Sequence, residues 1–151
     1  MELENILNTR KSCRKYTDEV LVQEDIDKIL WAGTRAPYAS GGPRRECYVT
    51  RDRATKLRIK EACHKQPYVS QCDTIITVCG FDKGNGDVLR SGYNKFIHDC
   101  DAATMCMILQ ATELNIGNCW IGHFKVEEMQ NILNIKTRPV VVLLMGRIKK
   151  V

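Results

Sequence analysis

The chain has 151 residues, of which 44% are hydrophobic and 27% are charged. These values are typical of one ordinary globular domain, and they exclude a disordered or fibrous protein. The net charge of +5 favours an anionic small molecule or nucleic acid as a partner without choosing between them. We therefore predict a single domain over residues 1–151.

Eight cysteines are spread along the chain, and no two of them form a C-x-x-C pair. Zinc, iron–sulfur and dithiol sites are therefore not indicated, and we predict no metal site. The first residues, MELENILNTRKS, are charged and lack the apolar core of a signal peptide. The longest strongly apolar run, at Val140 to Met145, is too short to span a bilayer. We expect a cytoplasmic protein with small buried cysteines and no membrane partner.

Helical spacing of apolar residues occurs twice near the N-terminus, at Leu3 to Leu7 and at Val22 to Leu30. Gly33 closes the second helix. A loop rich in proline and glycine, RAPYASGGPRREC, follows at Arg35 to Cys47, and loops of this kind often carry binding groups. The residues ECYVTR from Glu46 predict a strand, because β-branched and aromatic residues are enriched in strands.

The rest of the chain alternates helices and strands. We predict a basic helix at Ala54 to Cys63, a strand from Thr74, a long helix at Asn94 to Asn115, a short helix at Val126 to Leu133 and a strand from Val140. Apolar side chains surround most of the long helix, at Ala102, Met105, Cys106, Leu109 and Thr112 and beside them at Ala103, Met107, Ile108, Ala111 and Leu114. Such a helix is expected to be central. A few helices around a small sheet indicate an α+β domain.

The run TRKSCRKY, at Thr9 to Tyr16, gathers cations and a hydroxyl directly after the first short helix. The side chains concerned are Arg10, Lys11, Ser12 and Arg14. Arginine forks and a hydroxyl can supply charge-assisted hydrogen bonds to the terminal oxygens of a phosphate monoester. Such a run, taken alone, is also typical of a solvated basic turn.

The segment LNIGNCWIGHF, at Leu114 to Phe124, leaves the long helix through Gly117. Main-chain N–H groups beside Gly122 can bond to a flat heterocycle where a side chain would collide. A helix cap followed by a core Trp120 is the alternative interpretation. His123 has no visible partner, so we interpret it as structural.

Four segments resemble, in order and approximate spacing, the FMN-dependent nitroreductase family. They are RKSCRKY, AGTRAPYASGG, DCDAATMCMILQATELNIGNCWIG and RPVVVLLMG. The resemblance covers nearly the whole chain. It implies a small mixed or antiparallel sheet flanked by helices around a long central helix, in an intertwined homodimer with two FMN sites at the subunit interface.

The resemblance also implies the cofactor contacts. Contacts to the FMN phosphate and ribityl chain are implied for Arg10, Lys11, Ser12 and Arg14, and a C-terminal basic ligand for Lys149. The segment implied to lie against the isoalloxazine, with its main-chain donors near N5, is Trp120, Ile121 and Gly122. The residues implied to reach the same flavin from the partner subunit are Pro37, Tyr38, Ala39 and Gly41.

The loop departs from the family pattern after its Ala-Pro pair. Family members usually have Ser-Ala, then an Asn, a Gln and a Pro-Trp, whereas this chain has Tyr38, Gly41, Pro43, Arg44 and Arg45 in those places. We interpret Arg44 and Arg45 as solvated surface. The alternative is contact with an acidic substrate or with the phosphates of a nicotinamide.

The resemblance implies a ping-pong oxidoreductase in which NADH or NADPH reduces FMN and a small electron-poor acceptor, such as a nitroaromatic or a quinone, reoxidises it. Because the flavin carries the chemistry, no catalytic side chain is assigned. A flavoprotein of the same fold with another redox task, or with a ferredoxin reductant, is one alternative. A non-enzymatic basic module that binds nucleic acid is another, but aromatic residues make up only 7% of the chain and no stacking platform is evident.

Overall fold

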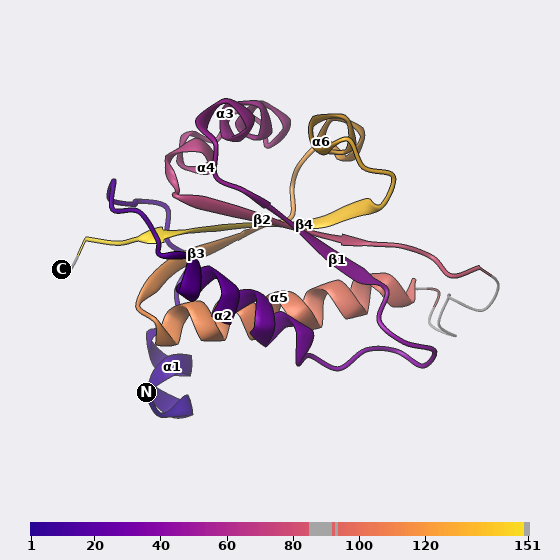
Figure 1. The fold of residues 1–151 in the computed structure, drawn as a ribbon, viewed down its shortest axis with the longest axis horizontal. Coiled ribbons are helices and arrows are strands. Elements are labelled where there is room, and N and C mark those ends of the chain that lie inside the picture. The colour runs from indigo at the N-terminus through magenta and orange to yellow at the C-terminus, as the bar shows by residue number, and fades with distance from the viewer. Residues whose placement is uncertain (85–91, 93, 150–151) are drawn as a thin grey trace.

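The computed structural model describes residues 1–84, 92 and 94–149. Their centre is a four-stranded antiparallel sheet in the order β1-β2-β4-β3 (Figure 1). The strands are β1 (Arg45–Thr50), β2 (Thr74–Gly80), β3 (Ile116–Ile121) and β4 (Arg138–Arg147). The two central strands are therefore β2 and β4, and β1 and β3 form the edges.

Helices cover both faces of the sheet (Figure 1). One face carries α1 (Leu3–Thr9), α2 (Gln23–Thr34) and α5 (Lys95–Glu113), and the other carries α3 (Arg53–Ala62), α4 (Pro67–Gln71) and α6 (Val126–Leu133). This arrangement confirms the predicted α+β class. Among the described helices, none combines the length and the apolar character that crossing a bilayer requires.

The long helix α5 is central, as its sequence predicts, but a single chain covers only part of it. Met107, Ile108 and Ala111 are buried in the core cluster between the sheet, α2 and α5. On the adjacent stripe, Met105 is 40% exposed and Cys106 is half-buried. The outer stripe of α5 is thus an apolar face that this chain leaves partly open to solvent.

The two central strands, β2 and β4, are buried on both faces of the sheet. All of β2 and residues 141–146 of β4 are buried. Ile75, Val142 and Leu144 face a second core cluster, which includes Ile59 of α3 and Met129 of α6. Six of the eight cysteines are buried and all eight are free, so most serve as small apolar residues, as expected.

Two elements differ from the prediction. The segment expected to leave the long helix as a loop forms the edge strand β3, with Ile116 opposite Arg147 and Ile121 opposite Val142. Glycine and asparagine are depleted in strands, so propensity argues against a strand at Gly117 and Asn118, and pairing with β4 outweighs it. Helix α4 was not predicted, because five residues are too few to show a helical period.

Candidate functional site

A cavity of about 680 Å³ opens beside the segment that follows α1. Residues 11–16 form one wall, and Gln71, Ile148 and Lys149 complete the lining. We call this the basic cavity, because four of its lining residues are exposed cations and none of the described lining residues is acidic. The four cations are Lys11, Arg14, Lys15 and Lys149. With the hydroxyl of Ser12, they can surround a compact anion.

Pairing with β3 fixes the main chain of the basic cavity. Ser12 forms a parallel bridge with Asn118, and the N–H of Cys13 donates to the carbonyl oxygen of Asn118 at 2.8 Å. The hydroxyl of Tyr16 donates to the carbonyl oxygen of Cys13 at 2.6 Å. Burial raises the pKa of Tyr16 far above its ordinary value, so this hydroxyl stays protonated and can keep donating.

Gly117 lets the two ends of the chain meet at the basic cavity. A Cβ on this residue would overlap Cγ2 of Ile148 and would lie 3.1 Å from Cβ of Cys13. The absence of a side chain therefore allows the C-terminal segment and the segment after α1 to pack on the same point of β3. Lys149 reaches the cavity directly from Ile148.

Arg14 is the cation of the basic cavity with a defined aromatic contact. Its guanidinium carbon lies 5.8 Å from the centroid of the Tyr68 ring, within the range of a cation–π interaction. A hydrogen bond with Tyr68 raises the pKa of Arg14 above its ordinary value. The guanidinium is therefore charged at every physiological pH, and its exposed position leaves it accessible to an anion.

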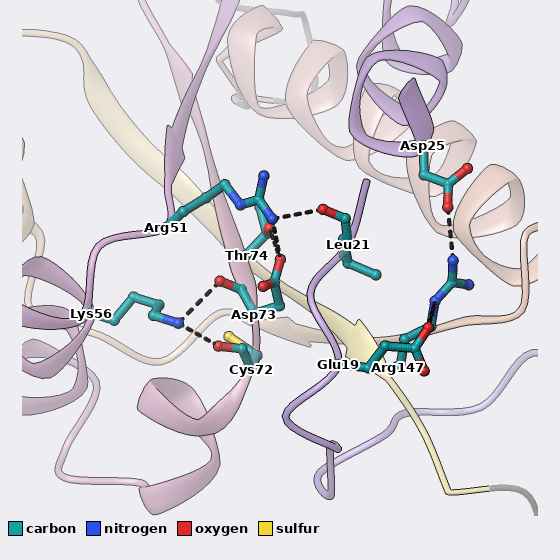
Figure 2. Close-up of polar contacts among 9 residues, drawn as sticks. All are labelled: Glu19, Leu21, Asp25, Arg51, Lys56, Cys72, Asp73, Thr74 and Arg147. Atoms are coloured by element: carbon teal, nitrogen blue, oxygen red, sulfur yellow. Dashed lines mark hydrogen bonds and ion pairs between the residues drawn. The ribbon is translucent and has the colours of Figure 1, made fainter. Parts of the chain in front are cut away.

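Polar contacts anchor the chain between the basic cavity and α2 (Figure 2). Nη2 of Arg147, in the last position of β4, donates to Oδ2 of Asp25 at 2.9 Å, and its Nε lies 3.3 Å from Oε1 of Glu19. Nη2 of Arg51 donates to the carbonyl oxygen of Leu21 at 2.7 Å. These contacts fasten the N-terminal segment to the ends of β1 and β4.

The structure places the other predicted contacts of the flavin phosphate and ring as follows. Arg10 is not among the residues that line the basic cavity; it caps the C-terminus of α1 and is half-buried. Trp120 and Ile121 end β3, two and three residues beyond the partner of Ser12. The side chain of Ile121 is buried, so only its main chain could meet a ligand. Gly122 is exposed.

The loop after α2 lies at the other end of α5. The N–H of Ala39 donates to Oδ1 of Asp99, near the start of α5, at 2.8 Å. At the far end of this helix, Thr112 accepts a hydrogen bond from Asn118, the residue beside the basic cavity. Asp99 and Thr112 are thirteen residues apart, which is about 20 Å along a helix. One chain therefore does not bring the loop to its own basic cavity.

The prediction that Arg44 and Arg45 are solvated surface is wrong. Arg44 is only 3% exposed, and its guanidinium donates to the carbonyl oxygens of Ser40 at 3.1 Å and Gly42 at 3.0 Å. Arg45 is half-buried and donates to main-chain carbonyls as well. The physical reason is that the loop folds back over its own C-terminal end, which leaves its carbonyl groups in need of donors.

Several lining residues of the basic cavity were not predicted. Lys15 belongs to the same cationic run as Lys11 and Arg14, so the charge pattern could have found it. Gln71 lies more than fifty residues away in sequence, and no local signal connects it with the run. Tyr16 contributes through its packing under Gly146, which only the fold shows.

Comparison of the sequence with known proteins finds a matching family model and two similar reductases. The model of the nitroreductase family matches residues 7–74 and 71–147. A protein of Archaeoglobus fulgidus, whose name assigns it provisionally as an NADH dehydrogenase/NAD(P)H nitroreductase, is 33% identical over 128 residues, which cover 85% of this chain and 71% of that protein. The FMN reductase (NAD(P)H) of Bacillus subtilis is 32% identical over 73 residues, 48% of this chain and 29% of that protein.

The fold has a close counterpart among solved structures. The crystal structure of a nitroreductase family protein from Clostridium novyi matches with a TM-score of 0.92 at 25% identity, over 99% of this chain and 87% of that one. The sequence match and the structural match thus extend over the same elements, from the segment after α1 to the end of β4. The chain belongs to the nitroreductase family.

Proposed function

We propose that this chain is an FMN-dependent oxidoreductase that moves two electrons from NADH or NADPH to an electron-poor acceptor such as a nitroaromatic or a quinone. The observation that carries the proposal is the basic cavity, where four cations and a hydroxyl converge beside β3 in a member of the nitroreductase family. The names of two relatives, an NAD(P)H nitroreductase and an FMN reductase, support the same cofactors. Its eight free thiols suit a reducing compartment, so we place it in the cytoplasm.

The residues present fit a flavin mononucleotide. The residues that would hold the phosphate in the basic cavity are Lys11, Ser12, Arg14 and Lys149. Because these cations are exposed, they can exchange their water for phosphate oxygens. The main chain of Trp120, Ile121 and Gly122 would then lie along the ring, because Trp120 and Ile121 follow the partner of Ser12 on β3 and Gly122 comes directly after this strand.

The bound flavin would supply the redox chemistry, accepting a hydride from NAD(P)H and passing two electrons to the acceptor in a ping-pong cycle. The chain itself binds and orients this cofactor. Gly122 is exposed, and a Cβ there would have nothing nearer than Nε1 of Trp120 at 3.8 Å, so the main chain is open to a flat ring. No side chain is assigned a proton-transfer role.

We further propose a homodimer in which each flavin site uses both chains. The loop residues Pro37, Tyr38, Ala39 and Gly41 lie about 20 Å along α5 from the basic cavity of their own chain. A two-fold axis near the middle of α5 would bring this loop to the partner's cavity and would cover the outer stripe around Met105. One two-fold rotation would thus both bring the loop to a basic cavity and cover the exposed outer stripe of α5.

An absorbance spectrum tests the proposed cofactor. The purified protein should be yellow or become yellow with FMN, and NADH or NADPH should bleach it without oxygen. A nitroaromatic or a quinone should then restore the colour. A protein that is still colourless once unbound FMN has been removed would refute the proposal. Bleaching by reduced ferredoxin, but by neither NADH nor NADPH, would refute only the proposed electron donor.

Sedimentation tests the shared site. The wild-type protein should sediment as a dimer with one FMN per chain. Met105→Asp would place a charge in the outer stripe of α5, so it should yield monomers that lose flavin, although Met105 need not touch the cofactor. A wild-type monomer that retains stoichiometric FMN would show that the loop is not lent to a partner.

A further inference from the structure

We infer that Asp99, Arg44 and Arg45 are positioning residues that pre-form the loop at 36–44 before flavin binds. The inference rests on the proposed function, because it assigns the loop's task as contact with the flavin ring. It also assigns the contact groups: since the arginines are turned inward, the loop offers its main chain and the ring of Tyr38 to the ligand.

Asp99 ties the two halves of the loop to α5. Asp99 is buried, with only 1% of its surface exposed. Its Oδ1 accepts from the N–H of Ala39 at 2.8 Å, and its Oδ2 accepts from the N–H of Arg44 at 2.9 Å. One buried carboxylate thus holds two amides five positions apart, and this sets the span of the turn between them. Hydrogen bonds to a charged group are among the stronger ones in proteins.

Arg44 fills the inside of the same turn. Its Nη1 donates to the carbonyl oxygen of Gly42 at 3.0 Å and lies 3.5 Å from that of Ala39, and its Nη2 donates to that of Ser40 at 3.1 Å. The loop therefore wraps round a guanidinium. The left-handed backbone that this path needs is supplied by Gly41 and Gly42, at φ of 95° and 93°.

Arg45 fastens the base of the loop. Its Nη1 donates to the carbonyl oxygens of Pro37 at 2.9 Å and Asp99 at 3.0 Å, and its Nη2 donates to that of Ala36 at 2.8 Å. Its guanidinium carbon also lies 6.0 Å from the centroid of the Tyr38 ring. The end of α2, the loop and the start of α5 are held together by this one side chain.

These contacts come from the chain's own groups, so the loop needs no ligand to take this shape. Its outer surface is nevertheless available, because Pro37, Tyr38, Ser40 and Gly41 are exposed. A binding loop that is already ordered loses less conformational entropy when its ligand arrives, and affinity rises accordingly. Arg44 and Arg45 would thus raise the affinity for flavin indirectly, by holding the loop in the shape that contacts the ring.

Amide hydrogen exchange of the full chain, freed of flavin, tests the pre-formed loop. The amides of Ala39 and Arg44 should both exchange slowly in the wild-type protein. At least one of them should exchange rapidly in Asp99→Asn, because the new side chain keeps one accepting oxygen and replaces the other by an NH₂ group that cannot accept from an amide. Asp82→Asn, at an exposed position two residues beyond β2, is the control and should leave both amides slow. Fast exchange in the flavin-free wild type, with protection only after FMN binds, would overturn the inference.

A comparison of the affinities for FMN and riboflavin distinguishes a residue that positions the loop from one that binds the phosphate. In Asp99→Asn the affinities for FMN and for riboflavin should fall by the same factor, about ten-fold, because the loop would meet the ring that both ligands share. Should Asp99→Asn fail to fold, Arg44→Lys is the second variant, since one ammonium cannot reach all the carbonyls that the guanidinium spans. Unchanged riboflavin affinity with exposed loop amides would refute the positioning role. Absence of FMN binding by the wild type would refute the proposed function, while the exchange rates would still decide whether the loop is pre-formed.

Discussion

Replacing Gly117 by alanine tests the packing that joins the two chain ends at the basic cavity. The new Cβ would overlap Ile148 and would lie 3.1 Å and 3.3 Å from Cβ and Sγ of Cys13, so a neighbour must move. Overpacking of this kind costs about 1–3 kcal/mol. For a domain of this size each kcal/mol lowers Tm by roughly 2–4 °C, so we expect a drop of roughly 2–12 °C.

The matched control for this prediction is Gly122→Ala. Neither glycine has a positive φ, and a Cβ at Gly122 would meet its nearest atom at the ordinary distance of 3.8 Å. Thermal unfolding followed by circular dichroism should therefore show a lower Tm for Gly117→Ala and an unchanged Tm for Gly122→Ala. Because Ile148 directly precedes Lys149, a proposed ligand of the phosphate, Gly117→Ala should also lower the affinity for FMN more than the affinity for riboflavin. Equal Tm values for the two variants would refute the packing argument.

Three further predictions concern charge. In fluorescence titrations, Arg14→Ala should lower the affinity for FMN by about ten-fold to a hundred-fold and leave the affinity for riboflavin unchanged, because only FMN carries the phosphate. Arg147→Met removes hydrogen bonds to a carboxylate and to a carbonyl and should destabilise the fold by about 2–3 kcal/mol in urea unfolding, whereas Lys28→Met, in an exposed pair, should change the midpoint little. Hydrogen bonds from Thr55 hold the pKa of Asp52 below its usual value, so the stabilisation from this helix cap is present above about pH 4 and is lost as the pH falls through the lowered pKa. Asp52→Ala should accordingly lower Tm at pH 7 and should lower it progressively less as the pH falls through the lowered pKa.

The sequence predicts those parts of the fold whose signal is local. The apolar run at Val140 to Met145 and the long helical stripe of α5 each carry their own periodicity, and both elements form as expected. Strand β3 has no such signal, because its Gly117 and Asn118 disfavour strands and it exists through pairing with β4. Element type was thus predictable where burial pattern and propensity agree, and not where pairing alone decides.

The candidate site divides in the same way. The cationic run around Lys11 and Arg14 is contiguous, so the sequence itself indicates an anion site. Lys149, which the family resemblance implied, lines the same cavity. The turn that encloses Arg44 is held by Asp99, which accepts from the main-chain N–H of Arg44 and is 55 positions away in the sequence. No local pattern encodes that contact, and surface exposure was therefore the wrong expectation for an arginine in a loop.

The same residue type does opposite work at the two ends of α5, and burial explains the difference. Arg14 is exposed, so a phosphate can replace its water at little cost. Arg44 is 3% exposed and already donates to carbonyl oxygens of its own loop, so its recruitment to a substrate would leave these partly buried acceptors without their donor. Each such loss costs about 1–3 kcal/mol, which is comparable to the gain from one new charged hydrogen bond. The position of a cation relative to unpaired carbonyl groups, more than the net charge of +5, therefore decides which arginines can bind an anionic ligand.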